Sequence, residues 1–197
     1  MSNTAETRIA VIVGSLRKDS INRHVAHALA DLAPKGTHFD FVEIGNLPLY
    51  NPDLEEGLEA PEAWTVFREK VKASDAVLFV TPEYNRSVPG ALKNAIDVGS
   101  RPYGDSAWAG KPAAVVTVSP GAIGGFGANH HLRQSLVFLD MPVLQQPEAY
   151  IGNAGALLGE DGSVANEGTR AFLKTFMTAL VSWIATLAAK KQSAKAA

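Results

Sequence analysis

The chain has 197 residues, 46% of them hydrophobic and 19% charged, which predicts a single globular domain and excludes an intrinsically disordered chain. Its formal net charge of −2 argues against a nucleic-acid partner, and the absence of cysteine excludes disulfides, thiolate metal sites and a cysteine nucleophile. The polar opening, Met1–Thr7, lacks the apolar centre of a secretion signal, so we expect a cytoplasmic protein with an ordered core over about residues 8–188.

Strands and helices are predicted to alternate along the chain. Continuous apolar runs are typical of buried parallel strands, and amphipathic runs are typical of helices packed on a sheet. In chain order we expect a strand over 8–13, a helix after Ser20 with Val25, Leu29 and Leu32 on one face, an edge strand over 38–43, a helix from Pro61 to Lys72, a strand over 76–81, a helix over 90–98, a strand over 113–119, a helix over about 129–139, a short strand within 142–150 and a long C-terminal helix. Such alternation predicts an α/β fold whose parallel sheet is covered by helices on both faces.

The C-terminal helix is expected to dock on the core. Its apolar stretch, Ala171–Ala189, carries polar side chains at steps of three and four, which places them on one helical stripe: Lys174, Thr175, Thr178, Ser182 and Thr186. This pattern predicts an amphipathic helix rather than a membrane span, so we expect no membrane partner. Residues 190–197 are expected to form a frayed tail. Because no repeat and no long linker divides the chain, we expect one domain over 1–197.

The loops that follow three buried strands have the most unusual composition, and they start at Gly14, Pro82 and Pro120. In parallel α/β sheets, ligands bind beyond the carboxyl ends of the strands, where these loops lie. Neither the glycine–lysine loop that binds nucleoside triphosphates nor the glycine pattern that binds dinucleotides is present in the first of them.

The first loop, 14–22, has the composition of a phosphate site. The start of the following helix offers free N–H groups and the positive end of its dipole. Arg17 supplies a fork that matches phosphate geometry, and Ser15, Ser20 and Asn22 supply short polar groups. These features predict a site for a phosphate monoester; the alternative is a capped helix with surface charges.

The second loop, 82–90, is stiffened by a proline at each end. Tyr84 offers an aromatic face, and Asn85 can both donate and accept hydrogen bonds. This composition fits a wall for a planar ring with a mixed hydrogen-bonding edge. The alternative is a rigid connection in which Pro89 starts a helix.

The third loop, 119–127, contains four glycines within seven residues, which lets its backbone pass close to a flat ligand. The alternative is a flexible surface loop. Its place after a central strand favours a role in binding.

Histidines do not form an evident metal site. His130 and His131 are adjacent and would point about 100° apart on a helix, so they cannot chelate one ion. His24 and His27 are spaced to share an ion, but no third ligand accompanies them. No Ser-His-Asp arrangement is evident either, so we expect no metal and no catalytic side chain. The chemistry is then expected to belong to a bound cofactor.

Together the loops resemble the NAD(P)H-dependent FMN reductase family, especially its quinone- and chromate-reducing branch. The resemblance extends from about Arg8 to Leu187. The residues that carry it are Gly14-Ser15-Leu16-Arg17 with Ser20 and Asn22, and Pro82-Glu83-Tyr84-Asn85 with Ser87, Pro89 and Gly90. Supporting matches are Leu47-Pro48-Leu49-Tyr50-Asn51, Leu92-Lys93-Asn94-Ala95-Ile96-Asp97 and His131-Leu132-Arg133-Gln134.

The resemblance implies a three-layer flavodoxin-like sandwich with a five-stranded parallel sheet in the order 2-1-3-4-5, and FMN as cofactor. It implies that the FMN phosphate is held by Ser15, Arg17, Ser20 and Asn22. It implies that the flavin ring is lined by Pro82, Glu83, Tyr84, Asn85, Ser87, Ser119 and Gly121. It also implies a homodimer or homotetramer, with a contact network that includes Tyr84, Arg133 and Glu148. One departure is Pro120, which has no backbone N–H to offer the flavin.

The resemblance thus implies an enzyme that transfers two electrons from NADPH or NADH, through FMN, to a small acceptor such as a quinone, a free flavin or chromate. Because one mononucleotide site is evident, donor and acceptor are expected to use it in turn, which gives ping-pong kinetics. One alternative is a flavodoxin-type electron carrier with protein partners, which the near-neutral charge disfavours. Another is a regulatory or scaffold protein that has lost the flavin.

Overall fold

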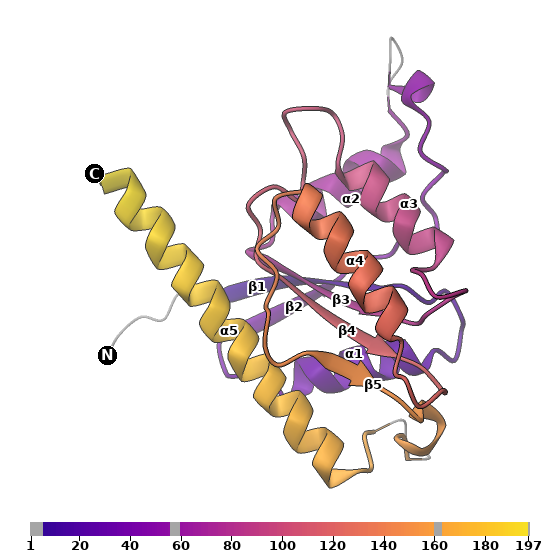
Figure 1. Ribbon diagram of the computed structural model, residues 1–197. Helices are drawn as coiled ribbons and strands as arrows, with labels where there is room; N and C mark the ends of the chain where they lie inside the picture. Colours follow the sequence, from indigo (N-terminus) through magenta and orange to yellow (C-terminus); the bar gives the residue numbers. More distant parts are fainter. Residues whose placement is uncertain (1–5, 56–59, 160–162, 197) are drawn as a thin grey trace.

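The computed structural model describes residues 6–55, 60–159 and 163–196, and it has a parallel sheet between two layers of helices (Figure 1). The strands are β1 (Thr7–Val13), β2 (Thr37–Phe41), β3 (Ala76–Thr81), β4 (Ala113–Val118) and β5 (Ala149–Ile151). The helices are α1 (Ile21–Asp31), α2 (Glu62–Lys72), α3 (Gly90–Gly99), α4 (Phe126–Phe138) and α5 (Glu167–Ala196). The strand order is β2-β1-β3-β4-β5, so the predicted α/β class and strand order are confirmed.

The sheet is apolar on both faces because each face carries its own core. In β1, Ile9, Val11 and Val13 belong to the core shared with α1 and α5. Ala10 and Ile12 belong to the other core, under α2, α3 and α4. Successive side chains of a strand point to opposite faces, so a strand buried on both sides reads as a continuous apolar run.

Some predicted boundaries differ from the observed ones; the edge strand predicted over 38–43, for example, is β2 over Thr37–Phe41. The fifth strand is Ala149–Ile151, at the far end of the predicted segment 142–150, and the earlier part forms only an isolated bridge between Val143 and Ala113. Pro142 and Pro147 donate no ladder hydrogen bonds, which limits pairing in that part.

The helix expected over 129–139 begins at Phe126, because Gly125 takes up a left-handed conformation (φ 78°) that allows the turn into it. The expected frayed tail is also wrong, since α5 continues to Ala196. The segment Glu167–Lys190 of α5 is long and apolar enough, by length and composition, to cross a membrane. In the structure, however, the side chains of Leu173, Phe176 and Leu180 lie in the core beside the sheet, as predicted for a docked helix.

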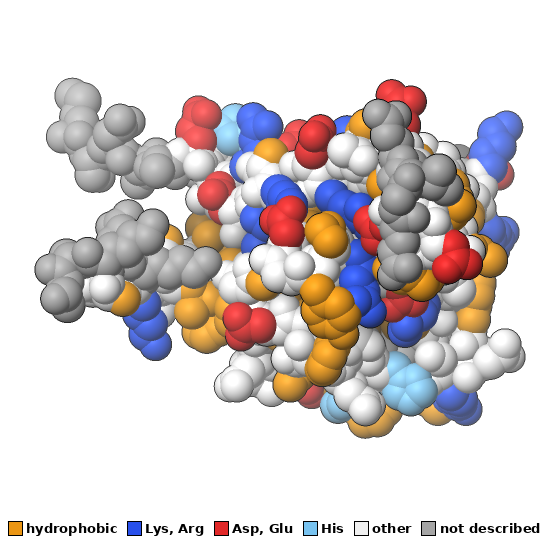
Figure 2. Space-filling model, turned by 90° about the horizontal axis from the view of Figure 1, so that it is seen from above, with side chains coloured by type: hydrophobic (Ala, Val, Ile, Leu, Met, Phe, Trp, Pro, Cys, Tyr) orange, Lys and Arg blue, Asp and Glu red, His pale blue; other side chains and the backbone are white. Residues whose placement is uncertain are grey.

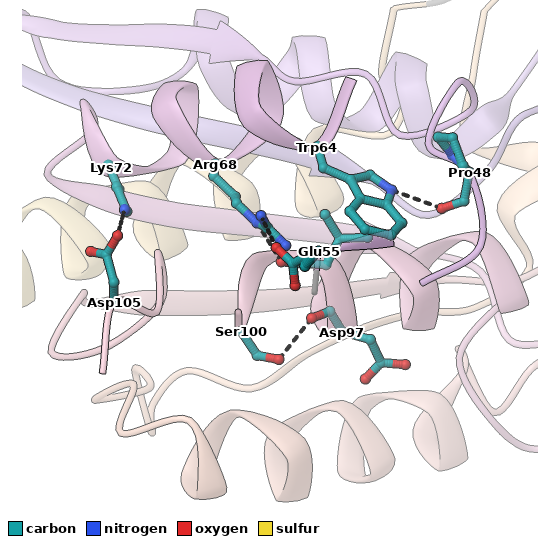
Figure 3. Close-up of polar contacts among 9 residues, drawn as sticks. Pro48, Glu55, Trp64, Arg68, Lys72, Asp97, Ser100 and Asp105 are labelled. Carbon is teal, nitrogen blue, oxygen red and sulfur yellow. Dashed lines mark hydrogen bonds and ion pairs between the residues drawn. The ribbon is translucent and has the colours of Figure 1, made fainter. Parts of the chain in front are cut away.

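The segment 47–55 forms a strap that crosses the outer side of α2 and α3 (Figure 3). The Trp64 indole donates to the Pro48 carbonyl at 3.0 Å, and Arg68 Nη1 lies 2.6 Å from Glu55 Oε1. Arg68 Nε also donates to the carbonyl of Val98 in α3, so one buried guanidinium joins the strap and both helices. The loop after β2 is therefore held on the helices.

Candidate functional site

The carboxyl ends of β1, β3 and β4 bring the three predicted loops to one cavity of about 340 Å³. Its lining side chains come from the three loops, from the end of β4 and from the segment after β5: Ser15, Arg17, Ser20, Ile21, Asn22, Pro82, Glu83, Tyr84, Val118, Ser119, Pro120 and Ala154. The predicted site residues outside this lining are Asn85, Ser87 and Gly121. The structure thus brings eight of the eleven predicted site residues to one cavity.

The first loop presents polar groups that a phosphate can use. Ser20 is the N-cap of α1, as predicted, and its hydroxyl accepts from the backbone N–H of Arg23 at 3.3 Å. Ser15, Ser20 and Asn22 are almost fully buried although they are polar. The Asn22 Oδ1 atom is buried and has no hydrogen-bond partner among the described residues, and the Asn22 amide also carries an Nδ2 donor that an anion in the cavity could use.

Arg17 is exposed at the same cavity, and among the described residues it has no hydrogen bond or ion pair. An unpaired guanidinium, the open end of α1 and a buried amide together form a donor set that suits a phosphate dianion. The residues present thus fit the phosphate of FMN.

Gly14 is a point of close packing between neighbouring strands, because Thr81 of β3 occupies the space beside it. A Cβ added at Gly14 would lie 2.8 Å from Thr81 Cβ and 3.3 Å from Leu92 of α3. The glycine is required because strand β1 ends tightly against its neighbours.

The second loop is a tight hairpin rather than an open connection. Tyr84 and Ser87 exchange both backbone hydrogen bonds, each at 2.9 Å. The two residues between them have positive φ, 51° at Asn85 and 63° at Arg86, as in a type I′ turn. Asn85 is therefore exposed at the tip, and Tyr84 is left half-exposed beside the cavity.

The third loop is held by backbone hydrogen bonds, although its residues 120–123 are exposed. Its Ser119 hydroxyl accepts from the N–H of Gly121 at 3.2 Å, which turns the chain around Pro120. The Gly121 carbonyl accepts from the N–H of Asn153 at 3.2 Å, and the Ser119 carbonyl accepts from that of Ala154. The loop is thus held by the segment that follows β5.

Sequence reasoning missed Ile21, Val118, Pro120 and Ala154 in the cavity wall. Ile21 and Val118 adjoin predicted residues, so their neighbours were a usable signal. Ala154 lies in a glycine-rich stretch beyond β5, where nothing in its composition marks a binding residue. Only the placement of β5 beside β4 brings it to the site.

Beside the third loop, a ring cluster joins α4 to β5. Tyr150 Oη lies 3.1 Å from His130 Nε2, and the ring of Phe126 contacts both rings at a tilt. Burial raises the pKa of Tyr150 above its usual value of 10.0, and a hydrogen bond with Glu148 raises it further. Tyr150 is therefore a neutral hydrogen-bonding phenol at neutral pH.

Arg133, which was expected in a subunit contact network, is engaged within the chain. Its Nε donates to Asn129 Oδ1 at 2.8 Å, and its Nη1 donates to the Leu144 carbonyl at 3.0 Å. Its Nη2 is buried and has no partner in the part of the chain that the structure describes. Across residues 6–55, 60–159 and 163–196, no three side chains of the metal-ligating types gather at one point.

Comparisons with known proteins agree with this geometry. The family described as NADPH-dependent FMN reductase matches residues 7–156. A quinone reductase of Pseudomonas putida is 66% identical over 177 residues, which cover 89% of this chain and 94% of that protein. A 2-hydroxy-1,4-benzoquinone reductase of a Burkholderia species is 48% identical and covers 90% of this chain and 96% of its own length.

Among solved structures, the flavoenzyme NAD(P)H:(acceptor) oxidoreductase FerB of Paracoccus denitrificans superposes with a TM-score of 0.85. It is 46% identical in sequence and covers 91% of this chain and 98% of its own. A flavodoxin from Pseudomonas aeruginosa has a TM-score of 0.55 at 18% identity, which shows a shared fold alone.

Proposed function

The chain belongs to the NADPH-dependent FMN reductase family, and from this premise we propose that its acceptor is a quinone. It is an FMN-dependent oxidoreductase that takes electrons from NAD(P)H. The observation that carries the quinone assignment is the 66% identity, over 89% of the chain, with the quinone reductase of Pseudomonas putida.

We propose that the cavity binds FMN with its phosphate at the first loop and its ring between the second and third loops. Ser15, Arg17, Ser20 and Asn22 would hold the phosphate through the donors described above. The ring would be lined by Pro82, Glu83, Tyr84, Asn85, Ser87, Ser119 and Gly121. FMN, when bound, supplies two-electron chemistry between NAD(P)H and the acceptor. The chain's own residues bind and orient it, and Tyr84 borders the open side on which a flat substrate can stack.

A small acceptor also suits the surface charge better than a protein partner does. Single-electron carriers dock through faces of one charge sign. On the face seen in Figure 2, Lys and Arg side chains lie beside Asp and Glu side chains, and hydrophobic side chains are scattered among them. With a net charge of −2, the chain lacks a strong single-sign excess.

We propose that the protein works in the cytoplasm as a homodimer or homotetramer. Three large side chains on the α3–α4 side are mostly exposed: Tyr103 at 82%, Val137 at 74% and Phe138 at 84%. A groove of about 860 Å³ lies between α3 and α4, with Ser87 of the second loop at its lining. Association through this side would cover apolar surface near the flavin site, and sedimentation analysis of wild type and Phe138→Glu tests it.

The function is tested by anaerobic spectroscopy of the FMN-loaded protein. NADPH or NADH should bleach the visible flavin bands, and a benzoquinone added next should restore them with quinol as product. Free flavin, an azo compound and chromate, tested in the same way, rank the other acceptors. Bands that persist with both nucleotides would overturn the NAD(P)H assignment, and recolouring by every acceptor except the quinone would overturn the quinone assignment.

Steady-state kinetics test the use of one site in turn. With the quinone concentration fixed at several values, double-reciprocal plots against the nicotinamide donor should be parallel. Intersecting lines would mean that donor and acceptor occupy the protein together, which a single shared face does not allow.

A further inference from the structure

The second loop is attached to α4 through one carboxylate. Glu83 Oε2 accepts a hydrogen bond from the backbone N–H of Ala128, in the first turn of α4, at 3.0 Å. The first turn of α4 has no acidic residue of its own, and its N-cap, Gly125, has no side chain that could accept a hydrogen bond. Glu83, which lies 45 positions before Ala128 in the chain, therefore accepts a helix N–H that would otherwise have no partner within the helix. Its negative charge also faces the positive end of the helix dipole.

The hairpin that follows Glu83 needs external support. Its second central residue, Arg86, has a φ of 63°, a conformation in which glycine is favoured and a long side chain is strained. Strained turns persist where surrounding contacts fix them. Here Glu83 Oε1 lies 3.3 Å from Arg86 Nη1, and Ser87 Oγ is hydrogen-bonded to His131 Nδ1 of α4 at 2.9 Å.

The helix also has a residue that permits the close approach. A Cβ added at Gly127 would lie 2.8 Å from the Arg86 carbonyl oxygen and 2.9 Å from Glu83 Oε2. Any side chain at this position would push the hairpin away from α4. The contact between loop and helix thus depends on the carboxylate at Glu83 and on the missing side chain at Gly127.

From these contacts we propose that Glu83 is a positioning residue that clamps the Tyr84–Ser87 hairpin to α4 and thereby sets the wall for the flavin ring. The inference rests on the flavin pocket proposed above. Pro82, Glu83 and Tyr84 line the cavity, so a hairpin released from α4 moves that wall. The phosphate loop is a separate segment, and its donors stay in place. Loss of the clamp therefore weakens binding of the ring and leaves binding of the phosphate intact.

Riboflavin and FMN separate the two ends of the pocket, because riboflavin has the ring without the phosphate. We would titrate each flavin into apoprotein and follow the quenching of its fluorescence. Glu83→Ala and Gly127→Ala should raise the Kd for both flavins by the same factor, roughly ten- to a hundredfold for a lost hydrogen bond to a charged group. In Glu83→Gln the amide oxygen can still accept from the N–H of Ala128, so its Kd values for both flavins should lie between those of these two variants and those of wild type.

The matched control is Glu69→Gln, which makes the same change at an exposed position on α2 and should leave both Kd values unchanged. Amide hydrogen exchange of apoprotein gives a readout that needs no flavin: exchange at Ala128 should speed up in Glu83→Ala. Should that variant fail to fold, Glu83→Gln and Gly127→Ala make the same comparison.

Two results would overturn the clamp. In the first, the variants melt at a lower temperature but keep both Kd values, which is the behaviour of a merely structural contact. In the second, FMN binding weakens while riboflavin binding does not, which would place the effect at the phosphate. Failure of wild-type apoprotein to bind either flavin would instead overturn the pocket assignment, and the exchange measurement distinguishes that case because it reports the loop–helix contact alone.

Discussion

The two ends of the candidate flavin pocket are built in different ways. At the phosphate end, the main features are local: Ser20 caps the helix that begins at the next residue, and Arg17 is exposed and needs no partner to face the cavity. At the ring end, the wall is a strained hairpin held by Glu83 and Ser87 through contacts that span 45 and 44 positions of the chain. A phosphate site can thus be made from one turn and one helix, whereas a ring site needs two distant segments in contact.

This difference has consequences for substitution. At the phosphate end, Arg17 can change affinity without changing the fold, because its side chain makes no hydrogen bond or ion pair with the other described residues. A side chain at the ring end affects affinity through the position of a loop. Substitutions at the two ends should therefore differ in whether they change flavin affinity, stability or both.

Gly14→Ala should have the largest effect on stability, because Gly14 packs against residues that are distant in the sequence. The new Cβ would lie 2.8 Å from the Cβ of Thr81, which ends the neighbouring strand β3. Overpacking of this kind should lower the free energy of unfolding by about 1–3 kcal/mol. Urea denaturation of the apoprotein measures it.

The control for that substitution is Gly90→Ala at the start of α3, where an added Cβ meets nothing within 4 Å. It should keep or slightly raise the stability, since alanine favours the helix more than glycine does. Equal unfolding midpoints for the two variants would mean that the end of β1 can shift to accept the added Cβ. The packing around Gly14 would then not be a distant constraint on the phosphate end.

Arg17→Ala should come next and should act on affinity alone. Loss of a charge-assisted hydrogen bond to phosphate is worth about 1.5–3 kcal/mol, which corresponds to a rise in the FMN Kd of roughly ten- to a hundredfold. Because Arg17 is exposed, the melting temperature of the apoprotein should not change. Lys18→Ala removes a neighbouring exposed cation and controls for charge in general. An unchanged FMN Kd, or an equal loss of riboflavin binding, would remove Arg17 from the phosphate site.

Most of the fold could be predicted because it depends on local patterns. The buried run over 76–81 became β3 with the same bounds, and the parallel class followed from the alternation of elements. Ser20 was identifiable as a cap because a serine before a helix satisfies N–H groups within the same turn. The phosphate end of the pocket was accessible to sequence reasoning for the same reason.

The ring end was less accessible because its geometry depends on pairs far apart in sequence. The role of Glu83 requires knowing that Ala128 lies beside it, and the place of Ala154 requires the position of β5. The start of α4 at Phe126 was missed because its cap comes from another loop. In each case the composition of the segment was visible, but its partner was not.

Arg86→Gly should have the smallest effect and should be opposite in sign. The left-handed conformation costs a residue other than glycine about 1–2 kcal/mol. Glycine avoids this cost, but its greater freedom in the unfolded chain lowers the stability of the folded state and cancels part of the gain. The ion pair that is lost involves a side chain 73% exposed, so it contributes little. We expect a net gain of less than about 1 kcal/mol in the unfolding free energy of the apoprotein, and a smaller change for Asn85→Gly, because asparagine tolerates this conformation.

Since Glu83 and Ser87 would still hold the hairpin on α4, the FMN Kd of Arg86→Gly should stay near that of wild type. A loss of stability in Arg86→Gly, with weaker binding of both flavins, would instead show that the Arg86 side chain supports the hairpin, and the ring end would then depend on its own turn as the phosphate end does.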